Sequence, residues 1–418
     1  MLKKYLPILL LTLYFFSFLI GELQGSYDRV APQFLAISIL NILGVIFLLH
    51  KKKLSKVPSF IIKSNILSAY SIYILISCIS ISVADNQAEA LIVVSQYFTF
   101  YLCFVLVYSI SRVEKLKFFR YFILITAFAI LIETYGVLST VIDYFIVNAN
   151  AFERSNILRG FSGNINIVSF SLAAKFPILI YLFFKIKHKL YSIFILLAIV
   201  FLSFVIFILL SRGAFISYII VLSILLIYKS FESLRVNYKK ILSILIAIII
   251  TYSLTNTLID KSNSGVIIDR VESIVDLNDA SISSRLRYYD DAISIIKIKP
   301  LMGLGLGNWK FISIELDYDD MHDYIVPAYV HNDFLQIAAE IGVLGAVAYL
   351  MIFIFSLMNL VKYIRKRKYV FECISLMSIF SVYFIDSMLN FPVSRPISHI
   401  FIIFVLVSVS NINTHIND

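Results

Sequence analysis

Twelve hydrophobic segments, each about long enough to cross a lipid bilayer as a helix, follow one another along the 418 residues. A helix needs roughly 20 apolar residues to span the hydrocarbon layer. Only 15% of the residues are charged, whereas a soluble protein carries about 25%. The sequence therefore predicts an all-α polytopic membrane protein. The segments lie near residues 5–20, 31–49, 66–83, 90–110, 118–142, 166–184, 190–210, 213–228, 241–258, 336–358, 372–389 and 396–411.

The basic residues are concentrated in alternate loops between these segments. Lysines and arginines gather near residues 51–63, 112–120, 185–189, 229–240 and 362–368. The short loops of the other set hold only Arg29, Arg154, Arg159, Arg212 and Arg395. Because cytoplasmic loops carry the excess of Lys and Arg, this pattern predicts cytoplasmic termini and one large outer loop over residues 259–335. The net charge of +10 thus indicates orientation in a membrane and not binding to nucleic acid.

Nothing in the composition divides the chain. We find no Pro/Ser linker, no low-complexity tract and no internal repeat, so residues 1–418 are expected to form a single integral membrane domain. The 259–335 loop would be inserted between the ninth and tenth spans. Cys78, Cys103 and Cys373 all lie in apolar segments, where they are expected to pack as small hydrophobic side chains.

The large loop carries most of the polar motifs. Residues 284–299 are expected to form an amphipathic helix on the membrane surface, because apolar residues recur at helical spacing, at Leu286, Tyr289, Ile293 and Ile296. Pro300 would end this helix. The following Gly303-x-Gly305-x-Gly307 series has neither dinucleotide-binding nor P-loop spacing, so it predicts a structural turn. Gly342 and Gly345 predict close helix packing.

Two arginines on the predicted outer side are candidates for binding an anion. Arg212 lies between two spans, where an arginine needs a partner or water; it can snorkel to the surface or bind a phosphate. Arg285 can be a surface charge of the loop or a second phosphate ligand. Arg287 would face elsewhere on the same helix, so at most one of the two is expected to point into a shared site.

His331 is the leading candidate for a general base, because a neutral imidazole can accept a proton near neutral pH. Its alternative role is a local hydrogen bond at the start of the tenth span. Tyr288, Asn332, Asp333 and Glu340 are further candidates to line or support the site. His322 lies near several acidic residues, but the spacing matches no zinc or calcium pattern, so no metal site is predicted.

Three polar residues near or within the sixth span are also candidates. Lys175 lies inside the apolar segment and needs a partner, for which Glu133 and Asp386 are available. A structural ion pair and a functional charge both remain open for it. Asn164 and Asn166 can line a cavity or cap the helix.

In their order and spacing, these motifs resemble the bacterial O-antigen ligase and O-antigen polymerase superfamily. The resemblance rests on Gly160-x-x-Gly163-Asn164-x-Asn166, Ser211-Arg212-Gly213, Arg285 before the Pro300–Gly305 turn, and His331-Asn-Asp-Phe-Leu followed by Glu340-Ile-Gly342-Val-Leu-Gly345. Two positions depart from the family pattern. Ile165 replaces a common proline, and Tyr289 replaces a frequent tryptophan.

The resemblance implies a metal-independent, inverting glycosyltransferase of the GT-C class in the bacterial inner membrane, with no cofactor. Its donor would be a glycan on undecaprenyl pyrophosphate, and its active site would face the periplasm. By motif match, Arg212 and Arg285 would bind the donor pyrophosphate, and His331 would activate the hydroxyl of the acceptor. The positive charge of the two arginines can stabilise a pyrophosphate leaving group, and a positioned base activates a sugar hydroxyl, which is a poor nucleophile.

The acceptor distinguishes the two activities of the superfamily. A ligase transfers the glycan to lipid A-core or a similar periplasmic acceptor, which is the interpretation we favour because Arg212, Arg285 and His331 match the ligase pattern. A polymerase transfers a growing chain to another lipid-linked repeat unit. A flippase or transporter that uses Lys175 is the alternative from another class.

Overall fold

The computed structural model describes residues 2–22, 28–147, 158–261, 280–316 and 327–412, and these residues form helices and connecting turns without a strand. The described part contains nine helices that are long and apolar enough to cross a membrane, together with shorter apolar helices at Tyr5–Phe15 and Pro396–Ser410. The chain is therefore an all-helical protein of the polytopic membrane type. Each of the twelve predicted segments falls on a helix, while the number that cross the bilayer stays a prediction.

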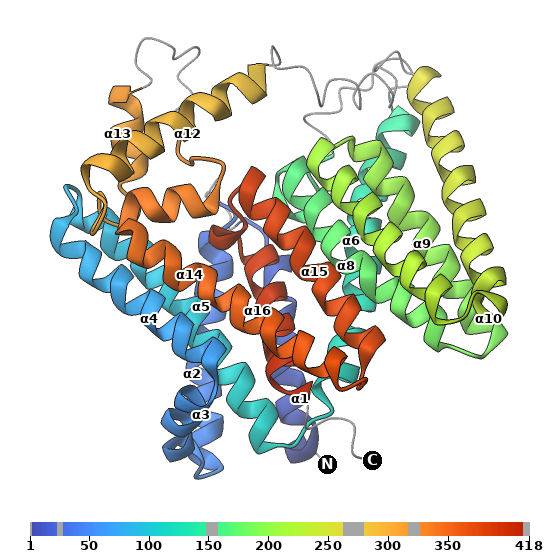
Figure 1. Ribbon diagram of the computed structural model, residues 1–418, viewed down its shortest axis with the longest axis horizontal. Coiled ribbons are helices and arrows are strands. Elements are labelled where there is room, and N and C mark those ends of the chain that lie inside the picture. Colours follow the sequence, from blue (N-terminus) through green and yellow to red (C-terminus); the bar gives the residue numbers. More distant parts are fainter. Residues whose placement is uncertain (1, 23–27, 148–157, 262–279, 317–326, 413–418) are drawn as a thin grey trace. The chain divides into compact units, whose positions relative to one another are not determined.

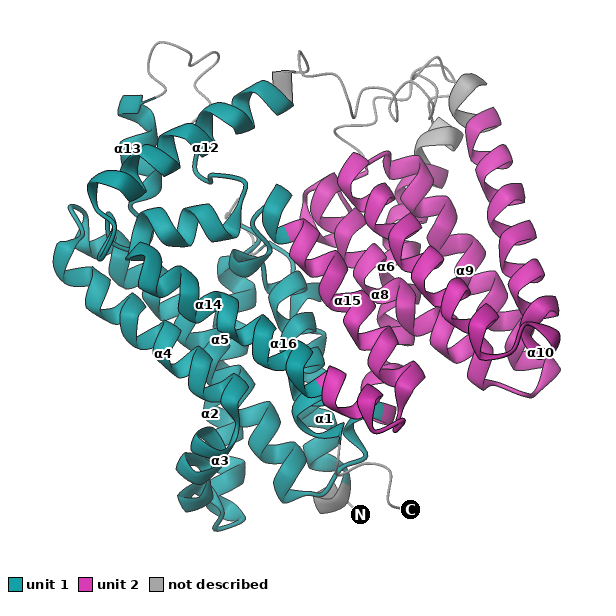
Figure 2. Ribbon diagram, viewed as in Figure 1, with its two compact units in different colours: residues 1–119, 277–359, 387–418 teal, residues 120–276, 360–386 magenta. Residues whose placement is uncertain are grey.

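The chain forms two compact units that are interleaved in sequence (Figure 2). Unit 1 comprises Met1–Phe119, Leu277–Asn359 and Ser387–Asp418, and unit 2 comprises Arg120–Asp276 and Leu360–Asp386. Whether the two units together form the single integral membrane domain expected from the sequence stays a prediction.

Unit 1 is organised around α5 (Gln87–Val113), which packs against α2, α4 and α16. Its other helices are α1 (Leu2–Phe15), η1 (Ser17–Leu19), α2 (Ala31–His50), η2 (Leu54–Lys56), α3 (Val57–Lys63), α4 (Asn65–Ser80), η3 (Ile81–Val83), α12 (Ala280–Ile298), α13 (Trp309–Leu316), most of α14 (Asp333–Arg365), η6 (Pro392–Ser394) and α16 (Pro396–Ser410). Figure 1 shows α12 and α13 at the end of unit 1 opposite the N-terminus, as the predicted topology requires. The side of the membrane that each end faces stays a prediction.

Unit 2 is built on three mutually packed helices, α8, α9 and α10 (Figure 1). It contains most of α6 (Phe118–Val147), η4 (Gly160–Ser162), α8 (Ile165–Lys185), α9 (Lys189–Leu209), α10 (Arg212–Lys261) and most of α15 (Val370–Leu389). Helix α10 covers two predicted segments, which meet at Ser233, where the backbone is extended (φ −172°, ψ 91°). Leu210, in the corner before α10, adopts a left-handed conformation (φ 47°), and the chain reverses there because α9 and α10 pack against each other.

The helix expected in the long loop is present as α12, while its place on the membrane surface stays a prediction. Ala292 and Ile295 are buried, whereas Leu286 and Ile293 are 49% and 38% exposed. The buried side packs on Leu304, Trp309, Val330 and Ala339. Tyr289 and Ile296 of the predicted apolar stripe pack against the same cluster, whereas Leu286 and Ile293 remain on the surface. Helix α12 ends two residues before Pro300, as predicted.

The glycine turn after Pro300 docks on a break in α14. Gly342 has φ 78° and ψ 172°, which interrupts the helix, and a Cβ there would collide with the Leu301 carbonyl oxygen. The carbonyl oxygens of Ala339 and Glu340 accept the backbone N–H groups of Leu304 (2.9 Å) and Gly305 (2.8 Å). The Val343 N–H donates back to the Pro300 carbonyl oxygen (2.9 Å). The turn thus satisfies backbone groups that the break leaves without helical partners.

Candidate functional site

His331 lies immediately before α14 in a strained backbone conformation. Its φ of 60° is in the left-handed region, which is uncommon for a residue other than glycine. The Tyr289 hydroxyl of α12 lies 3.1 Å from the His331 carbonyl oxygen and 2.9 Å from that of Met388, so it ties three segments of unit 1 together. Strained residues persist where the surroundings hold them in place, and they are frequent at functional sites.

Asn332 and Asp333 position the histidine from the helix side. The side-chain oxygen of Asn332 accepts the N–H groups of Phe334 (3.0 Å) and Leu335 (3.1 Å), so Asn332 caps the N-terminus of α14. Asp333 is 1% exposed, and its carboxylate accepts the Val393 N–H (3.2 Å). Both residues therefore hold the segment that carries His331, a role that the sequence allowed beside that of lining the site.

Glu340 lies at the end of the first two turns of α14 and supports the site from there. It is 2% exposed, and its carboxylate accepts the N–H of Trp309 at 3.2 Å. The Trp309 indole in turn donates to the Pro327 carbonyl oxygen (3.0 Å). Tyr288 packs against the same buried cluster as Trp309. Through these contacts, α12, α14, the glycine turn and the segment before His331 pack together. Glu340 and Tyr288 therefore support the site.

The imidazole of His331 lies near two arginines, Arg285 and Arg395, and one of its nitrogens forms no hydrogen bond with the described residues. Its Nδ1 is buried and finds no hydrogen-bond partner in the described part of the chain. Burial, followed by the charges of Arg285 and Arg395, lowers the pKa of His331 from 6.5 to about 4. The ring is therefore neutral at neutral pH, as a general base must be. The reference pKa expected from the residue type alone is higher, because it includes neither burial nor the arginines.

Arg285 of α12 is half-buried and acts electrostatically on both His331 and Tyr289. The structure thus brings one of the two predicted arginines to the candidate base. The expectation that only one residue of the Arg285/Arg287 pair reaches the site stays a prediction. The approach depends on α12 packing over the Trp309 cluster, since Arg285 and His331 are far apart in the sequence.

Arg395 is a member of this site that the motifs did not single out. It precedes α16, and its guanidinium carbon lies 4.8 Å from the centre of the Phe391 ring and 5.7 Å from that of Tyr329. The two rings are stacked at 4.0 Å, and the His331 ring contacts the edge of Phe391 at 5.2 Å. One signal was present in the sequence: arginines are scarce in the predicted outer loops, and Arg395 is one of the five.

Unit 2 places Asn164, Asn166 and Arg212 near one another. Asn164 caps α8, because its side-chain oxygen accepts the Asn166 N–H at 2.9 Å. The Asn166 side chain accepts the hydroxyl of Ser211 (2.9 Å), the residue before Arg212. Arg212 is half-buried at the start of α10. Because Arg212 belongs to unit 2 and His331 to unit 1, their convergence on one cavity stays a prediction.

Lys175 is part of a buried ion pair in unit 2. Its ammonium lies 2.9 Å from a carboxylate oxygen of Glu133, and the two side chains are 1% and 2% exposed. Ser171 bonds to both partners, donating to Glu133 at 2.8 Å and lying against the lysine nitrogen. Of the two acidic residues available from the sequence, Glu133 is therefore the partner that this pair uses. Such packing is typical of a structural pair.

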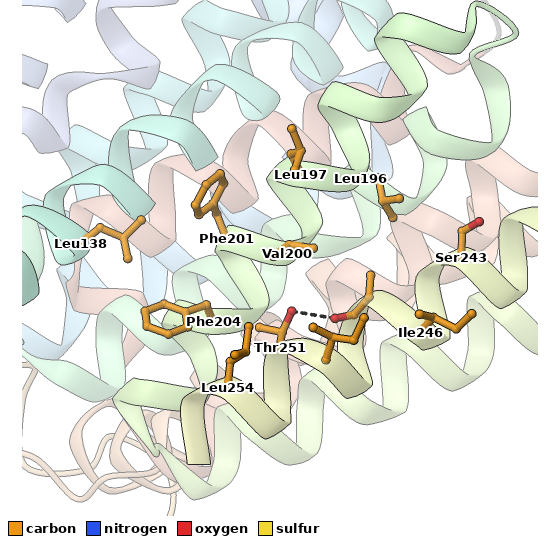
Figure 3. Close-up of a pocket in the computed structure, with 12 residues that line it drawn as sticks. Leu138, Leu196, Leu197, Val200, Phe201, Phe204, Ser243, Ile246, Thr251 and Leu254 are labelled. Carbon is orange, nitrogen blue, oxygen red and sulfur yellow. Dashed lines mark hydrogen bonds between the residues drawn. The ribbon is translucent and has the colours of Figure 1, made fainter. Parts of the chain in front are cut away.

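Unit 2 also contains an apolar cavity of about 630 Å³ between α6, α9 and α10 (Figure 3). Phe201 and Phe204 of α9 face it, and its two hydroxyl groups belong to Ser243 and Thr251 of α10. Both hydroxyls donate to carbonyl oxygens of their own helix, at 2.8 Å and 2.7 Å. The walls therefore offer hydrocarbon to an occupant and are unsuited to sugar or phosphate.

The acidic stretch around His322, with Asp317, Asp319, Asp320 and Asp323, lies outside the described residues. Among the residues that the structure describes, no group of three or more His, Cys, Asp or Glu side chains is arranged to hold a metal ion. The prediction that the site uses no metal stays a prediction.

Comparison with known families supports the resemblance seen in the motifs. Residues 197–350 match a family model described as O-Antigen ligase. The resemblance to the O-antigen ligase and polymerase superfamily is confirmed. The O-antigen ligase match includes Arg212, Arg285 and His331, whereas Arg395 lies beyond it. No curated protein matches the chain. The match implies a ligase or polymerase type of glycan transfer, with a lipid-linked glycan as substrate, in a bacterial membrane.

Proposed function

We propose that the protein is an O-antigen ligase-like glycosyltransferase. It moves a glycan from undecaprenyl pyrophosphate to a periplasmic acceptor such as lipid A-core. The observation that carries this proposal is the neutral imidazole of His331 beside two guanidinium groups. A base and fixed positive charge are what a hydroxyl nucleophile and a pyrophosphate leaving group require.

His331 accepts the proton of the acceptor hydroxyl as its oxygen attacks the anomeric carbon of the donor sugar. The bond between that carbon and the pyrophosphate oxygen breaks on the opposite face, and its electron pair leaves with undecaprenyl pyrophosphate. Attack opposite the leaving group inverts the anomeric configuration. Arg285 stabilises the charge that develops on the pyrophosphate, because a planar guanidinium binds phosphate oxygens in pairs. Arg212 does the same in the proposed complete site, so the arginines supply the charge without a metal.

The proposed setting is the inner membrane, with both termini in the cytoplasm and the site open to the periplasm. The prenyl tail of the donor stays in the bilayer while its headgroup reaches α12 and the start of α14. The loop charges support this orientation, since lysine-rich loops alternate with loops that hold few basic residues.

A polymerase would use the same donor chemistry with a second lipid-linked repeat unit as acceptor. The glycans of a deletion strain separate the two activities. If the final carrier receives no polymer while polymer remains on undecaprenyl, the protein is a ligase. If single repeats reach the final carrier, the protein is a polymerase.

A transporter using Lys175 is less well supported, because the lysine is buried against Glu133 and Ser171. Purified protein in proteoliposomes tests this directly with a labelled lipid-linked donor. Transfer of the label to an added acceptor supports an enzyme. Movement of intact donor across the bilayer without transfer would overturn the proposal.

A further inference from the structure

Arg395 is a half-buried cation whose guanidinium contacts rings and no carboxylate in the described residues. Its Nε is buried and has no hydrogen-bond partner there. A guanidinium stays charged at any physiological pH and carries five N–H donors in a planar fork. Leaving a buried donor without an acceptor costs about 1–3 kcal/mol, and more when the group is charged. Among the described residues, this buried donor therefore has no acceptor, and a ligand could supply one.

The surroundings hold the guanidinium without using its hydrogen-bond donors. Tyr329 and Phe391 are stacked at 4.0 Å with an interplanar angle of 10°, and Arg395 lies against both. An aromatic face attracts a cation by about 0.5–2 kcal/mol through its quadrupole and forms no N–H···O bond with it. The donors of the fork thus remain available to a ligand while the rings fix its position.

The position of Arg395 next to His331 indicates that such a ligand would be bound at the candidate base. The Phe391 ring contacts both the Arg395 guanidinium (4.8 Å) and the His331 ring (5.2 Å). Arg285 approaches the same imidazole from α12, and the charges of both arginines act on it. Asp333, two residues after His331, accepts the Val393 N–H. Two positive charges gathered at a neutral base form a site for an anion.

We propose that Arg395 binds an anionic group of the substrate, a phosphate or a carboxylate, beside His331. The identification of that group as part of a substrate rests on the proposed glycosyltransferase function. The anion has two available sources, the pyrophosphate of the donor and an acidic group of the acceptor. Arg395 is thus a substrate-binding residue additional to Arg212 and Arg285.

Two variants of Arg395 test this proposal. Arg395→Met removes the charge and keeps an unbranched side chain against the rings. Arg395→Lys keeps the charge without the planar fork. Arg29→Met is the matched control, because Arg29 also lies in unit 1 but is paired with Glu22 at 2.6 Å. All variants are purified as full chains, and equal size-exclusion profiles and melting temperatures establish that they fold.

The first arm measures binding of inorganic pyrophosphate by calorimetry. If the anion belongs to the donor, Arg395→Met weakens binding by roughly 10- to 100-fold, which corresponds to the loss of hydrogen bonds to a charged group. Arg395→Lys retains part of the affinity, and Arg29→Met has no effect. The second arm measures transfer with saturating donor. If the anion belongs to the acceptor, Arg395→Met raises the acceptor KM by the same factor, while pyrophosphate binding is unchanged.

A folded Arg395→Met protein with wild-type pyrophosphate affinity and wild-type acceptor KM overturns the inference. The first arm measures binding without turnover, so it tests anion binding by Arg395 separately from the proposed glycosyltransferase function. Wild-type protein that binds pyrophosphate through Arg395 but transfers no glycan contradicts the proposed function alone. Wild-type protein that transfers glycan, with both constants unmoved in the methionine variant, contradicts the role of Arg395 alone.

Discussion

Lys175 in unit 2 and Arg395 in unit 1 are both basic side chains in hydrophobic surroundings, but their partners differ. Lys175 is 1% exposed and bonds to Glu133 and Ser171, so its charge is compensated within the fold. Arg395 contacts aromatic rings, and its buried Nε has no acceptor among the described residues. A compensated charge has a structural task, whereas an uncompensated one beside a neutral base is available to a ligand. This difference supports the proposal that the residues around His331 bind the substrate.

The largest effect is expected at the base. His331→Ala lowers the initial rate of glycan transfer by roughly 100- to 10,000-fold, the range for loss of a general base. The measurement is transfer from a lipid-linked donor by purified protein at equal expression. His50→Gln is the control, because His50 is an exposed histidine at the end of α2 and its loss leaves the rate unchanged. A comparable loss in both variants would contradict a special role for His331.

The Lys175 pair is expected to affect stability and not the chemistry. Lys175→Met leaves the Glu133 carboxylate buried without its cation, which lowers the free energy of unfolding by about 3–5 kcal/mol. Equilibrium denaturation in mixed micelles measures this loss. The double variant Lys175→Met/Glu133→Gln recovers most of the stability and transfers glycan at the wild-type rate. A stable double variant without activity would show that Lys175 has a functional role and not only a structural one.

Arg285→Lys is expected to lower kcat/KM by roughly 10- to 100-fold although the charge is kept, because lysine lacks the planar fork that binds two phosphate oxygens. Arg287→Lys, two residues along the same helix, is the matched control with a small effect. Steady-state transfer with varied donor measures both. Equal activity of Arg285→Lys and wild type would exclude a bidentate contact at this position.

The smallest expected effect is a shift in pH dependence. The folded pKa of His331 is lowered to about 4, so kcat/KM should hold as pH falls through 6.5 and be lost near pH 4, where the base becomes protonated. Removal of positive charge by Arg395→Met raises this pKa and moves the midpoint toward 6.5. A wild-type midpoint at 6.5 that stays there in the variant would show that the arginines do not act on His331.

Local signals predicted much of what positions the site. Pro300 ends α12 as expected, and Asn164 caps α8, one of the two roles considered for it, because such signals act within a few residues. The partner of Lys175 could not be chosen between Glu133 and Asp386, since that choice depends on how α6 packs against α8. Arg395 was missed for a similar reason. Its neighbours Tyr329 and His331 are more than sixty positions earlier, and the fold brings them together.

The central claim, that His331 is the base of a glycan transfer, is tested most directly by single-turnover transfer with His331→Gln in proteoliposomes. Glutamine keeps a hydrogen bond but cannot take up a proton at neutral pH, so the account predicts a rate nearly as low as that of alanine. Binding of the lipid-linked donor, measured in the same preparation, should equal that of the wild type. Substantial transfer by the glutamine variant, with an unchanged pH profile, would contradict the account and leave His331 as an orienting residue.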